Sequence, residues 1–195
     1  MAVSQKLGSE LTRKGIHILI AFTPFIAAYS RSGTALFLML GTFVYVWAES
    51  LRFLGFSLPF ISSVTKAVLR TREKDNFALG PVTLGLGALL VLILFPAPVA
   101  AAAIYALAFG DSAATLTGMF LGRIRPSFLR GKSIEGSLAC FAVSAIAAFL
   151  VFRDIKIAVA AGLAAMLVDV LPVGDFDNIL LPLFAGLAIM ISMRT

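Results

Sequence analysis

Long apolar stretches dominate this chain, and shorter polar stretches separate them. The apolar segments lie at about 15–30, 33–49, 78–95, 98–122, 134–152, 155–171 and 178–193. A helix of roughly 20 apolar residues spans a bilayer, and somewhat shorter helices also do so. The pattern therefore predicts an all-α transmembrane bundle of about seven spans, formed by residues 1–195 as a single domain.

Residues 57–74, SLPFISSVTKAVLRTREK, follow a different pattern. Apolar and charged positions alternate there at helical spacing, with Phe60, Val64 and Val68 on one side and Lys66, Arg70 and Glu73 on another. A helix with one apolar and one charged face lies in the plane of a membrane surface. We predict such an amphipathic helix here, and an ordinary solvated loop is the alternative.

The composition supports a membrane protein. The chain is 60% hydrophobic and 13% charged, whereas soluble domains carry about 25% charged residues. The formal net charge is +6, but in a membrane protein excess lysine and arginine mainly set the orientation of the helices. The charge is therefore no evidence for nucleic-acid binding, and the sequence predicts no nucleic-acid partner.

The basic residues are unevenly distributed. Of the 16 lysines and arginines, 12 lie in the N-terminal segment and in the second and fourth connections between spans. With seven spans these regions share one side, which the positive-inside rule assigns to the cytoplasm. We expect a protein of the cytoplasmic membrane with a cytoplasmic N-terminus and an external C-terminus. The acidic sixth connection, VDVLPVGDFDN, falls on the cytoplasmic side by the same count.

Asp111 lies about midway along a predicted span. A carboxylate at such a depth is costly and by default faces the bundle interior or a water-filled cleft, where it has a function. Gly110 directly before it suggests a break in the helix. A carboxylate that is satisfied by a buried arginine or by helix termini is the alternative.

The segment RGKSIEGS, at 130–137, resembles part of a nucleotide-binding P-loop but is not one. The P-loop needs a glycine where this chain has Pro126. Gly131, Lys132 and a helix that starts near Ser133 nevertheless suit phosphate, because a helix N-terminus attracts anions. With Arg123, Arg125 and Arg130 nearby, these residues predict a polyphosphate site. A basic loop without any ligand is the alternative.

Oxygen-rich side chains near the same face suggest a magnesium site. Mg²⁺ in proteins is held by one or two carboxylates together with substrate phosphates. Asp177, and also Asp175 and Asn178, are candidates, although the last two also suit helix capping. His17, near the inner end of the first span, is either a general base or an interfacial hydrogen-bonding residue.

The order of these motifs resembles the CTP-dependent lipid-alcohol kinases, which include dolichol kinase, phytol kinase and the CTP-dependent diacylglycerol kinase of fungi. The resemblance lies in four motifs: Arg-Lys-x-x-His at Arg13, Lys14 and His17; Gly-Asp and a Gly-x-x-x-Gly at Gly110, Asp111, Gly118 and Gly122; Lys-Ser-x-Glu-Gly-Ser from Lys132 to Ser137; and Asp177, Asn178 and Pro182. The family often has glycine where this chain has Ala21. The extra N-terminal spans of eukaryotic dolichol kinases are missing, which suggests a compact, prokaryotic-type member.

The resemblance implies the function and the roles of the site residues. It implies Mg²⁺-dependent transfer of the γ-phosphoryl group of CTP to a membrane lipid alcohol at the cytoplasmic face; polyprenol, dolichol, diacylglycerol and phytol fit equally well. For the site, the resemblance implies CTP binding at Asp111 and from Lys132 to Ser137. Together with the chemistry above, the expected catalytic residues are Asp111, His17, Lys132 and Asp177, with His17 or one of the aspartates taking the proton of the alcohol. The expected metal ligands are Asp111, Glu135 and Asp177. The expected nucleotide contacts are Gly110, Arg123, Arg125, Gly131, Lys132, Ser133, Glu135, Gly136, Ser137 and Asn178.

Two other functions remain open from the sequence. A CTP-dependent cytidylyltransferase uses similar groups but makes a CDP-lipid and releases pyrophosphate. A small membrane transporter with Asp111 as its ion site is less favoured, because transporters often contain two matching halves with broken helices. This chain has a single cluster of polar motifs.

Overall fold

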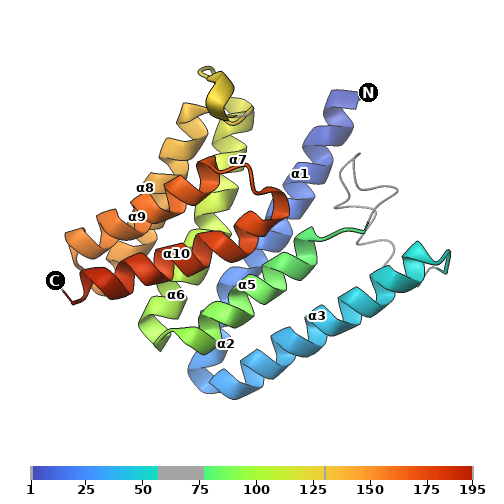
Figure 1. The fold of residues 1–195 in the computed structure, drawn as a ribbon, viewed down its shortest axis with the longest axis horizontal. Helices are drawn as coiled ribbons and strands as arrows, with labels where there is room; N and C mark the ends of the chain where they lie inside the picture. The colour runs from blue at the N-terminus through green and yellow to red at the C-terminus, as the bar shows by residue number, and fades with distance from the viewer. Residues whose placement is uncertain (1, 57–76, 130, 195) are drawn as a thin grey trace.

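The computed structural model describes residues 2–56, 77–129 and 131–194, and within them the protein is helical with no β-strand (Figure 1). The N-terminal part consists of α1 (Ala2–Leu19), η1 (Ile20–Phe22), α2 (Thr23–Tyr29) and α3 (Arg31–Phe53). The remainder consists of α5 (Gly80–Leu94), α6 (Ala97–Tyr105), η3 (Ala106–Gly110), α7 (Asp111–Phe120), η4 (Ser127–Leu129), α8 (Ile134–Phe152), α9 (Ile155–Val170), η5 (Gly174–Phe176) and α10 (Asp177–Ser192). The predicted surface helix at 57–74 lies outside the described residues.

Helices occupy all seven apolar segments that the sequence indicates. Five helical stretches in the described part of the chain are long and apolar enough to cross a membrane: Glu10–Tyr29, Arg31–Phe53, Ala97–Phe120, Ile134–Phe152 and Gly174–Ser192. The helices α5 and α9 are shorter, with 15 and 16 residues. At 1.5 Å per residue they extend about 22–24 Å, less than a hydrocarbon core of about 30 Å. The all-helical membrane fold is thus supported, whereas the count of seven spans stays a prediction.

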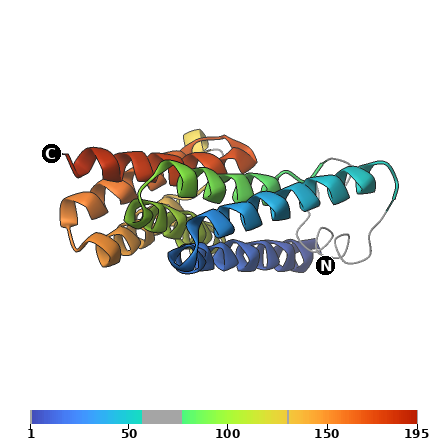
Figure 2. The same cartoon turned by 90° about the horizontal axis from the view of Figure 1, so that it is seen from below.

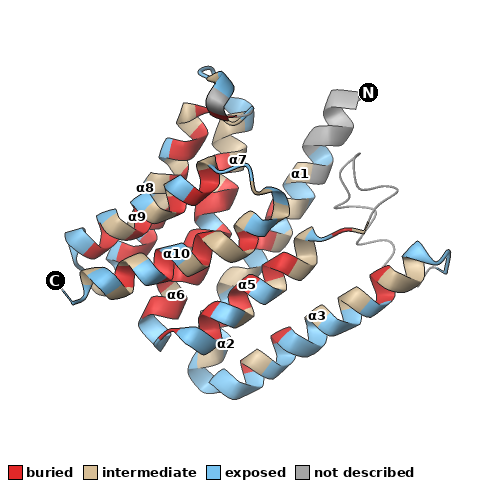
Figure 3. Cartoon of the chain, in the orientation of Figure 1, coloured by how far each residue is buried: buried red, intermediate tan, exposed pale blue. Residues whose placement is uncertain are grey.

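The outer surface is apolar, as expected for helices that face lipid. Side chains on α3 such as Phe37 and Phe43 are 69% and 68% exposed. Figure 3 shows exposed positions along most of α3, which packs on the rest of the bundle mainly through α5. A water-soluble protein would bury such rings, so these helices are compatible with an integral membrane protein.

The helices form two layers, and the helix from α6 to α7 lies in the middle of one of them. In Figures 1 and 2, α3, α5 and α10 lie side by side in one layer, and α1, α6–α7 and α8 lie in the other. The helix α9 contacts both α8 and α10 and connects the layers at one edge. Of the five long helical stretches, the one from α6 to α7 is the most buried. Asp111 therefore lies on the central element of the bundle.

The sequence predicts a break in the helix at Gly110, before Asp111. The helix instead continues, with one widened turn. Residues Ala106–Gly110 form a π-helical turn, η3, between α6 and α7. Such turns insert one extra residue into an α-helix and occur frequently at functional sites. Gly110 packs closely against α8: a Cβ atom at this position would lie 2.2 Å from Ser144 Oγ, so a larger residue here would require the Ser144 side chain to move.

Polar side chains define where several helices begin. Ser30 Oγ accepts a hydrogen bond from the amide of Gly33 at 3.1 Å, and Ser133 Oγ accepts one from Gly136 at 3.1 Å. These N-caps satisfy amides that have no partner within α3 and α8. Arg31 also donates to the carbonyl oxygens of Leu92 and Phe95, at 2.8 and 2.7 Å, and so satisfies the end of α5.

Close contact between α5 and α10 depends on Gly87. A Cβ atom there would lie 2.1 Å from the main-chain oxygen of Asn178. We expect Gly87→Ala to lower the free energy of unfolding by about 1–3 kcal/mol or more, the range for overpacked sites. Thermal unfolding of the purified protein in detergent measures the loss. The control is Gly41→Ala on α3, where an added Cβ atom meets no other atom within 4 Å; equal melting temperatures for the two variants would contradict the expected contact.

Candidate functional site

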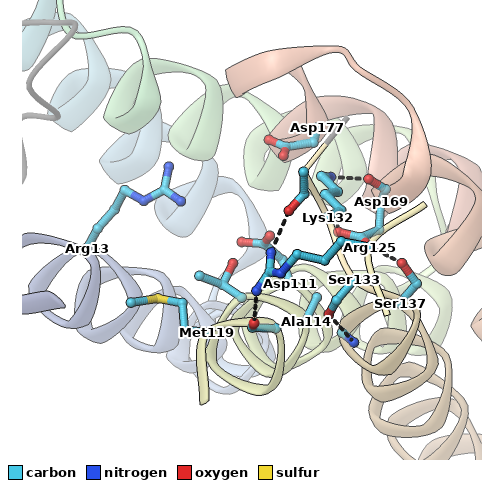
Figure 4. A pocket seen from close by; sticks show the side chains of 14 residues that line it. Arg13, Asp111, Ala114, Met119, Arg125, Lys132, Ser133, Ser137, Asp169 and Asp177 are labelled. Atoms are coloured by element: carbon cyan, nitrogen blue, oxygen red, sulfur yellow. Dashed lines mark hydrogen bonds and ion pairs between the residues drawn. The ribbon is translucent and has the colours of Figure 1, made fainter. Parts of the chain in front are cut away.

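A cavity of about 200 Å³ lies where α1, α7, α8, α9 and α10 converge (Figure 4). Among the described residues, six charged side chains line it: Arg13, Arg125 and Lys132, and Asp111, Asp169 and Asp177. Figure 4 shows Arg13 on one side, Lys132 and Asp169 on the other, and Asp111 between them. Charged groups that are far apart in the sequence thus meet inside an otherwise apolar bundle.

Asp111 is the centre of a buried charged cluster. Lys14 Nζ donates a hydrogen bond to Asp111 Oδ2, and His17 Nδ1 lies 3.0 Å from the same oxygen. Lys14 is 1% and His17 2% exposed, so water does not screen the interaction. Residues at i and i+3 share one face of a helix, which explains why both side chains on α1 reach Asp111. The cation that satisfies this carboxylate is a lysine, not the arginine considered from the sequence.

Asp169 is the second buried carboxylate of the cavity. Lys132 Nζ lies 3.1 Å from Asp169 Oδ1 and also bonds the main-chain oxygen of Asp169, while Ser137 Oγ donates to Oδ2 at 3.0 Å. These contacts connect the loop before α8 with the last turn of α9. Lys132, expected as a phosphate ligand, is therefore partly neutralised by a carboxylate of the protein.

The loop between α7 and α8 is shaped by its own polar side chains. Arg125 donates to the carbonyl oxygens of Gly118 and Gly131, at 2.5 and 2.6 Å. Gly131 has a φ of 94°, which favours glycine. Glu135 accepts hydrogen bonds from the amides of Arg123 and Ile124, at 3.0 and 3.1 Å. The loop is thus held in one conformation over the start of α8.

The structure brings together only part of the predicted site. The predicted residues that line the cavity are Asp111, Arg125, Gly131, Lys132, Ser133, Gly136, Ser137 and Asp177. The others have different surroundings. Gly110 packs against α8, Glu135 holds the loop through the amide of Arg123, and the Asn178 amide donates to Thr83 Oγ1 at 3.0 Å. His17 reaches the site only through Asp111.

Two functional candidates were missed from the sequence alone. Asp169 was counted only as an acidic residue of the sixth connection, and Lys14 only for topology and as part of a motif. A usable signal existed for both, because an ionisable residue at or inside the end of an apolar segment needs a partner. The partner itself was not predictable, since Lys14 and Asp111 are 97 positions apart in the sequence.

The carboxylates test whether magnesium fits. Within residues 2–56, 77–129 and 131–194, no three His, Cys, Asp or Glu side chains are arranged to hold a metal ion by themselves. The expected set of Asp111, Glu135 and Asp177 is therefore not assembled as a cage. Asp111 already has a lysine partner, whereas Asp177 lines the cavity and makes no hydrogen bond or ion pair with a described residue. The residues fit Mg²⁺ held by Asp177 and by the phosphates of a substrate, its usual mode of binding.

The buried ion pair should be strongly coupled. Lys14→Met leaves Asp111 as an unpaired charge, and breaking such a pair costs roughly 3–5 kcal/mol. We expect Lys14→Met to lower the melting temperature in detergent far more than the double variant Lys14→Met/Asp111→Asn, which removes both charges. A double variant as unstable as the sum of the two single variants would show that Lys14 and Asp111 do not interact.

No protein-family model, no curated protein and no solved structure matches this chain. What the chain does is therefore inferred from its cavity, its charged residues and its motifs.

Proposed function

We propose that this protein is a CTP- and Mg²⁺-dependent kinase of a membrane lipid alcohol, with its active site at the cytoplasmic face. One observation carries the proposal: a cavity with three cations and three carboxylates lies inside a bundle of apolar helices. Such a site suits a reaction in which a water-soluble phosphate donor meets a hydroxyl group of a lipid. The choice of CTP comes from the resemblance of Asp111 and Lys132–Ser137 to the CTP-dependent kinases.

The phosphates of the donor would lie at the start of α8. Ser133, Gly136 and Ser137 line the cavity there, and Lys132 and Arg125 supply positive charge. The N-terminus of a helix adds the partial positive charge of its dipole. Phosphoryl transfer depends mainly on positioning and charge neutralisation, and these residues supply both.

The charges of the cavity favour a requirement for a metal ion. Among the described residues, its three cationic side chains are balanced by three carboxylates, so these side chains do not neutralise a triphosphate. Mg²⁺, held by Asp177, would supply the missing positive charge and bridge phosphate oxygens. Lys132 and Arg125 would orient the phosphates, and His17, whose Nδ1 lies 3.0 Å from Asp111 Oδ2, is the candidate to accept the proton of the alcohol.

The direct test is a reaction of the purified protein with labelled CTP and several lipid alcohols. We expect CDP and a lipid monophosphate, complete loss of product when EDTA removes Mg²⁺, and little activity with ATP, GTP or UTP. Release of pyrophosphate with a CDP-lipid would instead identify a cytidylyltransferase. Activity with ATP but none with CTP would contradict the proposal, and solute flux into proteoliposomes without any lipid product would favour a transporter.

A matched pair of lysine variants tests the cavity. Lys132→Ala should lower kcat/KM for CTP roughly 100-fold or more, the usual effect of removing a group that stabilises developing charge. Lys156→Ala is the control, because Lys156 is exposed in the first turn of α9, at the other end from Asp169. Similar kcat/KM values for the two folded variants would exclude Lys132 from the reaction.

We also propose that α5 and α9 cross the membrane as short spans, which gives seven in all. The 12 basic residues in the N-terminal segment and the second and fourth connections then share the cytoplasmic side. Reporter fusions should report a cytoplasmic N-terminus and an external C-terminus. Both ends on the same side of the membrane would contradict the count of seven spans. They would also place the connections that line the cavity on opposite sides of the membrane.

A further inference from the structure

A second, much smaller cavity lies on the other side of the Asp111 cluster. It has a volume of about 20 Å³ and is lined by Arg13, Ile16 and His17 of α1, by Ala78, Gly80, Pro81 and Leu84 at the start of α5, and by Asp175. We name it the α1–α5 cavity. Arg13 is the one described residue that also lines the cavity of about 200 Å³, which we name the polar cavity, so the two cavities are neighbours.

His17 connects the α1–α5 cavity to Asp111. Its Nδ1 atom lies 3.0 Å from Asp111 Oδ2, and the residue lines the α1–α5 cavity but not the polar one. The other ring nitrogen, Nε2, has no hydrogen-bond partner among the described residues. Nδ1 is buried against the Asp111 carboxylate and makes no hydrogen bond there, so Nε2 is the ring nitrogen left to meet a further ligand. The pair of Asp111 and His17 therefore has an open hydrogen-bonding position.

The size and lining of the α1–α5 cavity restrict what fits. A polar site needs about 10–15 Å³ of such volume for one water molecule, so a cavity of about 20 Å³ holds a hydroxyl group but no phosphate or sugar. Ile16, Pro81 and Leu84 give it apolar walls that suit the carbon atoms next to a hydroxyl. Ile18 and Leu19, the next two residues after His17 on α1, are 39% and 62% exposed. The cavity thus combines a polar end with an apolar surrounding.

We propose that the α1–α5 cavity binds the hydroxyl end of the lipid-alcohol acceptor, with His17 Nε2 as its hydrogen-bond partner. This inference rests on the proposed function and adds to it the place where the acceptor binds. The phosphate donor occupies the polar cavity, and the acceptor hydroxyl approaches from the opposite side of the Asp111 cluster. Arg13 lines both cavities and lies 3.8 Å from Asp175. The donor phosphates and the hydroxyl would therefore meet beside the Arg13 side chain.

Gly80 allows a sharp test. It lines the α1–α5 cavity, and a Cβ atom built on it meets no other atom within 4 Å, so Gly80→Leu adds a bulky side chain at the edge of the cavity without a clash at Cβ. We expect at least a tenfold rise in KM for the lipid alcohol and an unchanged KM for CTP. The matched control is Gly41→Leu, at an exposed position of α3 with equally open space; both KM values should stay as in the unsubstituted protein. An unchanged acceptor KM in folded Gly80→Leu would overturn the proposal.

A second measurement does not depend on catalysis. The one native cysteine, Cys140, is buried, so Gly80→Cys and Gly41→Cys each introduce an accessible thiol. Geranylgeraniol or dioctanoylglycerol should slow maleimide labelling of Gly80→Cys at least fivefold and leave Gly41→Cys unaffected, whereas hydrocarbons without the hydroxyl should protect neither. Equal labelling rates with and without the alcohols would overturn the acceptor site.

The two failures are distinguishable. A protein that binds no CTP and makes no lipid phosphate contradicts the proposed function itself. A protein that phosphorylates a lipid alcohol but responds to neither substitution at Gly80 leaves that function intact and contradicts only the acceptor site.

Discussion

The cost of a charge inside an apolar bundle governs this structure. An unpaired carboxylate in such surroundings is highly unfavourable, and each buried one has a cation within reach. Lys14 pairs with Asp111 and Lys132 with Asp169, while Arg52 bonds both carboxylate oxygens of Glu49, at 2.7 and 2.8 Å. The first two pairs each join two segments that are far apart in the sequence, whereas Arg52 and Glu49 lie three positions apart on α3. The pairs Lys14–Asp111 and Lys132–Asp169 lower the cost of burying charge at the cavity, and they also connect the helices that surround it.

Several charged side chains at the cavity already have partners within the protein. Glu135 and Arg125 spend their hydrogen bonds on main-chain groups and hold the loop before α8. Lys132 and Asp111 are paired with Asp169 and Lys14, so the described charges around the cavity are close to electrical balance. The balance explains how so many charged side chains are compatible with so apolar a protein.

The sequence predicted the helices well and the contacts between them poorly. Apolar runs depend only on local composition, so the span at 134–152 coincides with α8 and that at 155–171 differs from α9 by one residue. Lys132 and Glu135, three positions apart in one motif, have unrelated partners because their side chains leave the backbone in different directions. Asp169 joined the site only through the packing of α9 against α8. Periodicity shows which face of a helix is polar, but not which neighbour that face meets.

The π-helical turn η3 has a consequence for the register of the central helix. One residue advances an α-helix by about 100°, and the wider turn holds one residue more than an α-helical turn. Leu107 and Ala108, within this turn, are completely buried in the apolar core, while Asp111 just after it faces α1. A regular helix through this segment would satisfy one of these two faces and misdirect the other. The extra residue thus uncouples the rotational setting of the carboxylate from that of the core, so that a single helix serves both.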